Sequence, residues 1–292
     1  MLLTIFTPTY NRIETIDRLY KSLVNQTNHL FEWVVIDDGS DDNTEHYFNK
    51  MNLANTPFKV NYKKVLNGGK HRAINKGVEI AEGEYFFIVD SDDWLPANSI
   101  EFILSWLGTI AIENKKFAGI SGLKGYDKKQ IVGKTFKGTY VDCSALNRHK
   151  FNVFGDKSEV YKTSLLRKYK FPEIEGENFM TESVVWNRMA ADGYYIRYIN
   201  EINYICAYLE DGLTKNIDKT YVENLKGYSL YVREYLQYQK SVVLKTRMIM
   251  AYGYRGRKFN LSYNKLAGNL GISVAKMFLL SNLGLLYKIL KA

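Results

Sequence analysis

The chain has 292 residues, of which 46% are apolar and 14% aromatic, and its formal net charge is +9. This composition excludes a disordered protein, and the length suffices for one large α/β domain with an appendage. The two cysteines, Cys143 and Cys206, offer no disulfide framework and no zinc spacing, which fits a reducing compartment. The first residues lack a signal-peptide pattern and no apolar run reaches about 18 residues, so we expect a cytoplasmic protein without a spanning helix.

The positive charge is concentrated at the C-terminal end. Residues 235–292 contain no Asp or Glu but ten Lys and Arg residues, and subtracting these ten charges from +9 leaves −1 for residues 1–234. A basic end attracts an anionic surface, either lipid headgroups or nucleic acid. The chain has no helix-turn-helix, RNP or zinc-finger signature, so we expect no nucleic-acid partner.

The first third of the chain alternates strands and helices. Short apolar runs predict strands at Leu2–Phe6, Phe31–Ile36, Lys59–Val65 and Tyr85–Val89, and helical spacing predicts helices at Ile13–Val24, Asn43–Met51, His71–Ala81 and Ala97–Leu107. A right-handed crossover between successive parallel strands makes their carboxyl ends open on the same edge of a sheet. We therefore predict an α/β fold with a Rossmann-like, mostly parallel sheet, whose ligands bind at that edge.

Polar loops follow three of these strands, at residues 7–12, 37–42 and 90–93. In the stretch Tyr85–Trp94, YFFIVDSDDW, the side chains of Asp90 and Asp92 share a face if the segment is extended. Two carboxylates on one face suit Mn²⁺ or Mg²⁺, which in turn binds phosphate oxygens. A solvated acidic turn is the simpler interpretation of an isolated D-x-D, but three polar loops meeting at one crevice favour a binding site.

The rest of the chain is less regular and then becomes helical. Residues 119–155 mix glycine, lysine and β-forming residues and predict extra strands with a mobile loop. Further elements are predicted as a short apolar run at Val160–Leu166, a helix from Thr181 to Ala191, strands within Ile196–Ala207, and helices at Tyr221–Lys240, Val242–Tyr252 and Leu266–Leu290, with a Gly/Arg-rich break at 253–262. We predict a catalytic domain at 1–215 and a basic helical segment at 216–292.

Four motifs stand in the order and spacing of family 2 glycosyltransferases: TPTYNR at 7–12, DDGSDD at 37–42, NGGKHRAINKG at 67–77 and DSDD at 90–93. Over about residues 1–210 the chain resembles the bacterial members with the GT-A fold that build capsule, O-antigen and exopolysaccharide. The resemblance implies a metal-dependent, inverting hexosyltransferase. It would move a sugar from a UDP-sugar donor to a saccharide or lipid-linked saccharide acceptor.

The resemblance also assigns roles to individual residues. The nucleotide-sugar residues would be Thr7, Pro8, Tyr10, Arg12, Asp38, Gly69, Lys70, Asp90 and Ser91. Among these, Asp38 would accept a hydrogen bond from uracil, Lys70 would lie near the sugar–phosphate, and Asp90 would approach the ribose or the metal. Asp92 would ligate Mn²⁺ or Mg²⁺. Glu182 would be the base that deprotonates the acceptor.

Two departures from the family pattern affect this assignment. The family usually has Glu-Asp where this chain reads Thr181-Glu182-Ser183, and Glu177 is the main rival of Glu182 as the base. A histidine that can ligate the metal in the family has no match in residues 204–211, YICAYLED, so no third protein ligand is predicted.

Other functions and partners stay open at this point. The basic end favours a binding or scaffold protein of a polysaccharide-assembly complex, and the α/β crevice is shared with nucleotidyltransferases, although these would carry a Gly-rich, basic loop where TPTYNR stands. Residues from about Tyr235 are predicted to dock on the inner face of an anionic membrane without spanning it. The alternative is that the amphipathic stretch Leu266–Leu290 packs on the body of the protein or on a second subunit.

Overall fold

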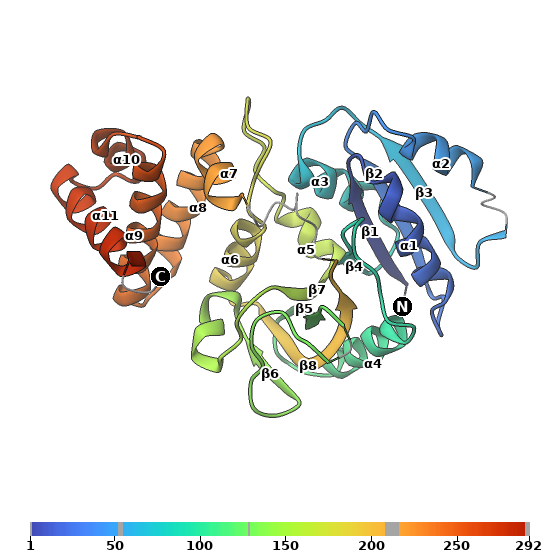
Figure 1. Cartoon of the computed structure of the whole chain (residues 1–292). Helices are drawn as coiled ribbons and strands as arrows, with labels where there is room; N and C mark the ends of the chain where they lie inside the picture. Colours follow the sequence, from blue (N-terminus) through green and yellow to red (C-terminus); the bar gives the residue numbers. More distant parts are fainter. Residues whose placement is uncertain (1, 52–54, 128, 208–215, 290–292) are drawn as a thin grey trace. The chain divides into compact units, whose positions relative to one another are not determined.

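The computed structural model describes residues 2–51, 55–127, 129–207 and 216–289, and the chain divides into two compact units (Figure 1). The first unit comprises Met1–Phe171 and Arg188–Leu209, and the second comprises Pro172–Asn187 and Glu210–Ala292. The domain boundary predicted at residue 215 lies outside the described residues. The structure groups residues 172–187 with the C-terminal helices, whereas the sequence placed them with the catalytic domain.

In the described part of the first unit, the strands form one eight-stranded sheet in the order β3-β2-β1-β4-β7-β5-β8-β6. They are β1 (Leu3–Thr9), β2 (Phe31–Asp37), β3 (Lys59–Lys64), β4 (Tyr85–Ile88), β5 (Phe117–Gly125), β6 (Tyr140–Cys143), β7 (Lys157–Lys162) and β8 (Tyr195–Ile205). The first four strands pair in parallel, with Leu3 opposite both Phe31 and Tyr85. The predicted Rossmann-like half is thus present. β7 lies antiparallel between β4 and β5, so the remaining strands extend the sheet in a mixed arrangement.

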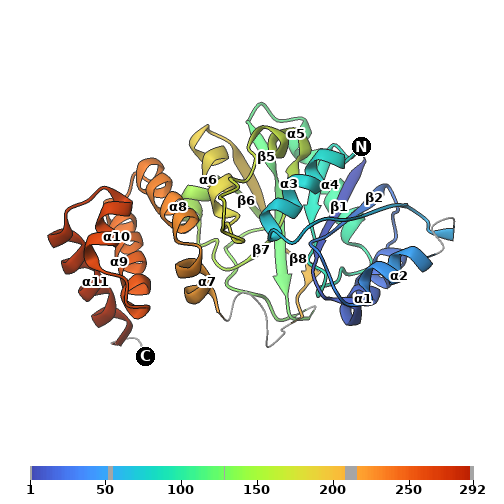
Figure 2. The same cartoon turned by 90° about the horizontal axis from the view of Figure 1, so that it is seen from above.

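Helices cover both faces of the parallel strands. The core on one face joins Leu3 and Trp33 of the sheet to residues of α1 (Ile13–Val24), α2 (Thr44–Lys50) and α4 (Ser99–Ala111). α3 (Lys70–Ile80) lies on the opposite side of β1 and β2 from α1 and α2 (Figure 2). There Gly77 is so close to the Phe6 ring that a Cβ would meet it at 2.2 Å. The side chains of alternate β1 residues therefore pack on opposite faces of the sheet, as strand geometry requires.

Shorter elements complete the first unit. A 3₁₀ helix at Ala145–Phe151 follows β6, and α5 (Thr163–Lys168) follows β7. The predicted apolar run at Val160–Leu166 is therefore the end of a strand joined to the start of a helix. The predicted irregular stretch at 119–155 contains most of the fully buried strand β5, whose pairing with β7 and β8 no local pattern shows.

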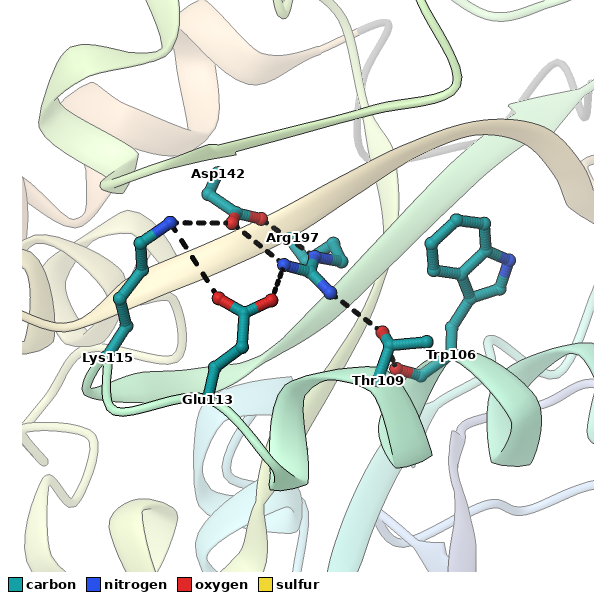
Figure 3. A network of polar contacts seen from close by, with 6 residues as sticks. All are labelled: Trp106, Thr109, Glu113, Lys115, Asp142 and Arg197. Carbon is teal, nitrogen blue, oxygen red and sulfur yellow. Dashed lines mark hydrogen bonds and ion pairs between the residues drawn. The ribbon is translucent and has the colours of Figure 1, made fainter.

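Arg197 ties the edge strand β6 to the end of α4 (Figure 3). Its side chain is only 3% exposed and donates from Nε to Asp142 Oδ1 at 2.8 Å and from Nη1 to Thr109 Oγ1 at 2.8 Å. It also pairs with Glu113, while Lys115 Nζ lies 3.1 Å from Asp142 Oδ2. Arg197 stands directly opposite Asp142 in the β6–β8 ladder, so these side-chain contacts add a cross-strand pair to the backbone pairing that holds the edge strand.

The second unit holds the long helices. They are α7 (Ile217–Glu223), α8 (Leu225–Tyr238), α9 (Val242–Lys258), α10 (Tyr263–Leu270) and α11 (Val274–Ile289), while α6 (Ser183–Ala191) starts in this unit and ends in the first. Their apolar core includes Tyr228, Val232, Tyr252, Leu266 and Met277. The side of α11 that carries Met277 and Leu280 is buried in this core, as expected for most amphipathic helices.

The helix boundaries predicted in this region are wrong at three places. The stretch predicted as one helix at Tyr221–Lys240 breaks at Asn224, and Leu266–Leu290 breaks at Gly271, whose φ of +66° ends α10. The predicted break at 253–262 is instead mostly helix, because α9 continues to Lys258. Its glycines allow close helix packing: a Cβ on Gly253 would meet Ser281 Oγ at 2.0 Å.

No single described helix is long and apolar enough to cross a membrane. Tyr263–Leu270 and Val274–Gly284 reach the required length and composition only together, as a pair bent by 108°.

Candidate functional site

The carboxyl ends of β1, β2 and β4 bring the three predicted polar loops to one edge of the sheet. The loops after β1 and β2 are joined directly, because the Asn11 N–H donates to Ser40 Oγ at 2.9 Å and the Asp41 N–H donates to Asn11 Oδ1 at 2.9 Å. Asn11 adopts a φ of +50°, a left-handed conformation that asparagine tolerates better than most residues. The first two motifs therefore form one continuous surface.

Asp38 holds the loop that precedes α3. Its two carboxylate oxygens accept hydrogen bonds from the N–H groups of Gly68 and Gly69, both at 2.8 Å. Burial raises the pKa of Asp38, although these amide hydrogen bonds act in the opposite direction. Gly69 has a φ of +94° at the start of α3, a conformation that strains any residue with a Cβ. Asp38 thereby fixes the point from which Lys70 extends.

Lys70 brings the third motif to the DSDD stretch. Its Nζ lies 2.7 Å from Asp90 Oδ1. Burial alone would raise the pKa of Asp90, but the ammonium groups of Lys70 and Lys124 outweigh it and lower that pKa. Lys124, at the end of β5, also pairs with Asp156 at 2.9 Å and lies 4.4 Å from the ring centre of Tyr204. Asp90 is therefore an ionised carboxylate between two cations.

The neighbouring carboxyl groups of Asp92 and Asp93 have raised pKa values, in contrast to Asp90. Burial and the negative charge of Asp90 raise the pKa of Asp92. The same two causes raise the pKa of Asp93 to about 7. Asp93 accepts hydrogen bonds from the Tyr204 hydroxyl at 2.7 Å and from the Ala207 N–H at 2.8 Å, so it fastens the end of β4 to the segment after β8.

The residues predicted to line the nucleotide differ in exposure. Thr7 and Pro8 are buried, and Thr7 Oγ1 accepts a hydrogen bond from Trp33 Nε1 at 3.0 Å. Tyr10 is 48% exposed, whereas Ser91 is buried. Arg12 directly precedes α1, and its charge acts on Asp92. Of these residues, Tyr10 has the most exposed side chain.

Several residues near the site were not predicted from the sequence. Lys124 lies in β5 and Asp156 directly precedes β7, two strands whose pairing is non-local, and no pattern around these residues indicates a site. Arg18 of α1 donates a hydrogen bond to the backbone carbonyl of Asp92, and its guanidinium stands 4.3 Å from the ring centre of Trp94. In the sequence, the feature that pointed to this contact was the position of Trp94 directly after the acidic stretch.

The donor set fits a divalent cation that is shared with a ligand. The described residues contain no group of three His, Cys, Asp or Glu side chains placed to hold a metal ion. Burial and the negative charge of Asp90 nevertheless raise the pKa of Asp92, and a bound cation would offset the repulsion between the two carboxylates. Mg²⁺ usually binds one or two protein carboxylates and completes its shell with phosphate oxygens and water. Asp92, assisted by Asp90, is such a partial set.

Glu182 and its rival Glu177 belong to the second unit. Glu182 is half-buried and directly precedes α6, whose Val185 N–H donates to the Glu182 carbonyl at 3.0 Å. Glu177 is only 8% exposed, and its carboxylate oxygens accept the N–H groups of Lys226 at 2.7 Å and Gly227 at 2.8 Å. Glu177 therefore has a structural use as the N-terminal cap of α8.

Comparison with known proteins identifies relatives of this chain. It is 30% identical over 172 residues to the poly(ribitol-phosphate) beta-glucosyltransferase of Bacillus spizizenii, which covers 58% of this chain and 26% of the relative. It is 27% identical over 274 residues to the GalNAc(5)-diNAcBac-PP-undecaprenol beta-1,3-glucosyltransferase of Campylobacter jejuni, covering 91% of this chain and 81% of that relative. The chain thus spans about a quarter of the first relative and four fifths of the second.

A solved structure shows the same fold. The crystal structure of Staphylococcus aureus TarS 1-349 in complex with UDP-GlcNAc superposes with a TM-score of 0.64 at 21% identity, covering 89% of this chain and 73% of TarS 1-349. The predicted GT-A fold is therefore confirmed. The family model for glycosyl transferase family 2 matches residues 4–110. This part of the chain, which builds β1 to β4 and the loops around Asp38, Lys70 and Asp92, is similar to glycosyl transferase family 2.

Proposed function

We propose that the protein is an inverting glycosyltransferase that moves a sugar from a UDP-sugar to a saccharide or lipid-linked saccharide acceptor in the synthesis of a cell-surface polysaccharide. The observation that carries this proposal is the charge pattern at the end of β4. There Asp92 has a raised pKa beside an Asp90 that is held ionised by Lys70 and Lys124. A cation site next to two ammonium groups suits a departing diphosphate, whose charge must be neutralised.

The relatives support the choice of substrates. TarS 1-349 was crystallised with UDP-GlcNAc, and the Campylobacter enzyme is named for a saccharide carried on undecaprenol diphosphate. Asp38 supports uracil as the base, because each carboxylate oxygen keeps a second lone pair beyond the amide that it accepts from Gly68 or Gly69. That lone pair could accept the N3–H of uracil.

The proposed reaction is a single displacement. The acceptor hydroxyl oxygen forms a bond to the anomeric carbon while the bond from that carbon to the diphosphate oxygen breaks, and its electron pair leaves with UDP. The carboxylate of Glu182, which directly precedes α6, takes the hydroxyl proton. Asp92, with Asp90, would hold Mn²⁺ or Mg²⁺, which when bound supplies positive charge to the diphosphate.

Two assays test this function. The full-length protein is incubated with a panel of UDP-sugars and Mn²⁺, and UDP release that EDTA abolishes is expected for at least one of them. Calorimetric titration in Mn²⁺ should show tighter binding of UDP than of GDP or CMP. A preference for GDP would contradict the role of Asp38. Absence of UDP binding and of UDP release would favour the scaffold interpretation.

We further propose that the second unit attaches the enzyme to the cytoplasmic face of an anionic membrane. The basic residues at 235–292 support this, and so do exposed apolar side chains on α11, where Phe278 is 55% and Leu279 59% exposed. The buried side of α11 serves the helical core, so this exposed side is the part available to lipid. Such a location suits a lipid-linked acceptor.

A further inference from the structure

The segment that carries Glu182 is held by α7, by α8 and by the residue between them. Within the second unit, Glu177 caps α8 by accepting the N–H groups of Lys226 and Gly227. These N–H groups belong to the first turn of the helix and have no acceptor inside it. A carboxylate is also favoured at the positive end of a helix. The contact therefore fixes the start of the segment to α8.

Asn224, between α7 and α8, holds the next two residues. Its Oδ1 accepts the N–H of Asn178 at 2.8 Å and the N–H of Phe179 at 3.0 Å. Its Nδ2 donates to the Thr220 carbonyl of α7 at 2.9 Å, so the amide is fixed at both ends. The Phe179 ring meets the Tyr221 ring edge-on, with ring centres 5.5 Å apart.

Glu182 itself lies between two hydrogen-bonded neighbours. Thr181 is hydrogen-bonded to Tyr221, and Ser183 is hydrogen-bonded to Tyr231. Tyr221 in turn stacks on Tyr228, with ring centres 4.2 Å apart, in the cluster around the apolar core of the second unit. The residues before and after Glu182 are thus both attached to aromatic side chains whose own positions are fixed by packing.

We propose that α7 and α8 are a positioning device for the base, in which Tyr221, Asn224 and Tyr231 fix the backbone of Glu182 and hence its carboxylate. This inference rests on the proposed role of Glu182. Tyr221, Asn224 and Tyr231 act through Glu182 and are positioning residues. Their effect can be large, because a displacement of about 1 Å in a reacting group can cost about 10²-fold in rate.

The first test removes single hydrogen bonds from the segment. Asn224→Leu removes the acceptor of two N–H groups, and Tyr221→Phe removes one hydroxyl but keeps the stacked ring. Both should lower kcat, by up to about 10²-fold for Asn224→Leu, while the Kd for UDP stays unchanged. Tyr235→Phe is the matched control: its hydroxyl, on α8, accepts a long 3.5 Å hydrogen bond from Gln239 Nε2 at the end of that helix, so its removal should change neither kcat nor the Kd for UDP. Asn224→Asp keeps the accepting oxygen and should restore most of the rate.

The second test distinguishes positioning from general destabilisation. Asn224→Leu is combined with Glu182→Gln, and a residue that acts through Glu182 should cause no further loss in that background. An equal loss of kcat in both backgrounds, or no loss from Asn224→Leu and Tyr221→Phe in the wild-type background, would overturn the inference. If Glu182→Gln alone leaves transfer unchanged, the base assignment fails instead, which is a separate result.

Discussion

The carboxyl groups at the end of β4 differ in acidity because their surroundings differ. Asp90 faces Lys70 and lies near Lys124, so its pKa is lowered in spite of burial, whereas burial and the negative charge of Asp90 raise the pKa of Asp92. The two carboxylates would therefore contribute differently to the proposed cation site. Asp90 keeps the lysines in place, and Asp92 is the group that gains most from a bound cation.

Replacing Asp92 by alanine should remove the metal-dependent part of nucleotide binding. We expect Asp92→Ala to weaken UDP binding in Mn²⁺ to the level that wild-type protein shows in EDTA, and to abolish most transfer. Calorimetry with and without Mn²⁺ measures this directly. Glu45→Ala, which removes an exposed carboxylate paired with Lys64 on the surface, is the control and should change neither binding nor transfer. Unchanged Mn²⁺ dependence in Asp92→Ala would remove Asp92 from the metal site.

Replacing Glu182 by glutamine should affect transfer alone. Glutamine keeps the size and hydrogen-bonding capacity of Glu182 but cannot take a proton, so transfer should fall by about 10²–10⁴-fold with UDP affinity nearly unchanged. Glu177→Gln is the comparison. In this variant one N–H of α8 would face the NH2 group of glutamine, a donor, in place of a carboxylate oxygen that accepts. Glu177→Gln should lower the melting temperature of the protein and should reduce the rate of transfer much less than Glu182→Gln does. Loss of transfer in Glu177→Gln with normal transfer in Glu182→Gln would reverse the assignment.

At the level of elements, the sequence predicted the parallel half of the sheet and much less of the rest. The strands β1 to β4 are short apolar or alternating runs bounded by turn residues, so their local pattern suffices. β7 reads KSEVYK, with Lys157 and Ser158 buried, and its place between β4 and β5 depends on partners far away in the chain. For the same reason Lys124 and Asp156 could not be assigned to the site, whereas Lys70 and Asp90 followed from their motifs.

The Arg197 network on β8 predicts a large loss of stability when it is broken. Arg197→Met leaves the buried carboxylate of Asp142 with only Lys115 as a partner, and breaking a buried ion pair typically costs about 3–5 kcal/mol. Urea unfolding measures the change in the free energy of unfolding. Lys115→Met, at a side chain that is 52% exposed, should cost less than about 1 kcal/mol. Equal effects of the two variants would show that the network is not the main attachment of β6.

At the level of the whole molecule, the C-terminal helices combine a core with an exposed apolar surface. Ile249, Tyr252, Leu266 and Met277 pack with Tyr228 and Val232 of α8. A truncation at Gln239 would remove these partners and expose the apolar face of α8. A loss of membrane binding by the truncated protein would therefore not show that the removed residues contact lipid. Point variants on the exposed side of α11 are the better test.

Exposed apolar side chains on α11 should contribute to membrane binding. We expect the double variant Phe278→Ser with Leu279→Ser to sediment less with vesicles of phosphatidylglycerol and phosphatidylcholine than the wild type does, because burial of each side chain is worth about 1.5–3 kcal/mol. Ile112→Ser, at an 87% exposed residue of the first unit, is the matched control and should sediment like the wild type. Equal sedimentation of all three proteins would contradict the membrane proposal.

The contacts between residues 177–183 and the helices at 217–238 also bear on the order in which parts of the protein form during synthesis. A ribosome makes the chain from its N-terminus, so β1 to β4 and their loops emerge well before Asn224, Tyr221 and Tyr231 do, and N-terminal regions generally fold first during synthesis. The nascent chain would then contain the nucleotide surface before the segment with Glu182 has its partners. On the proposed role of Glu182, sugar transfer would begin only after α8 has emerged from the ribosome.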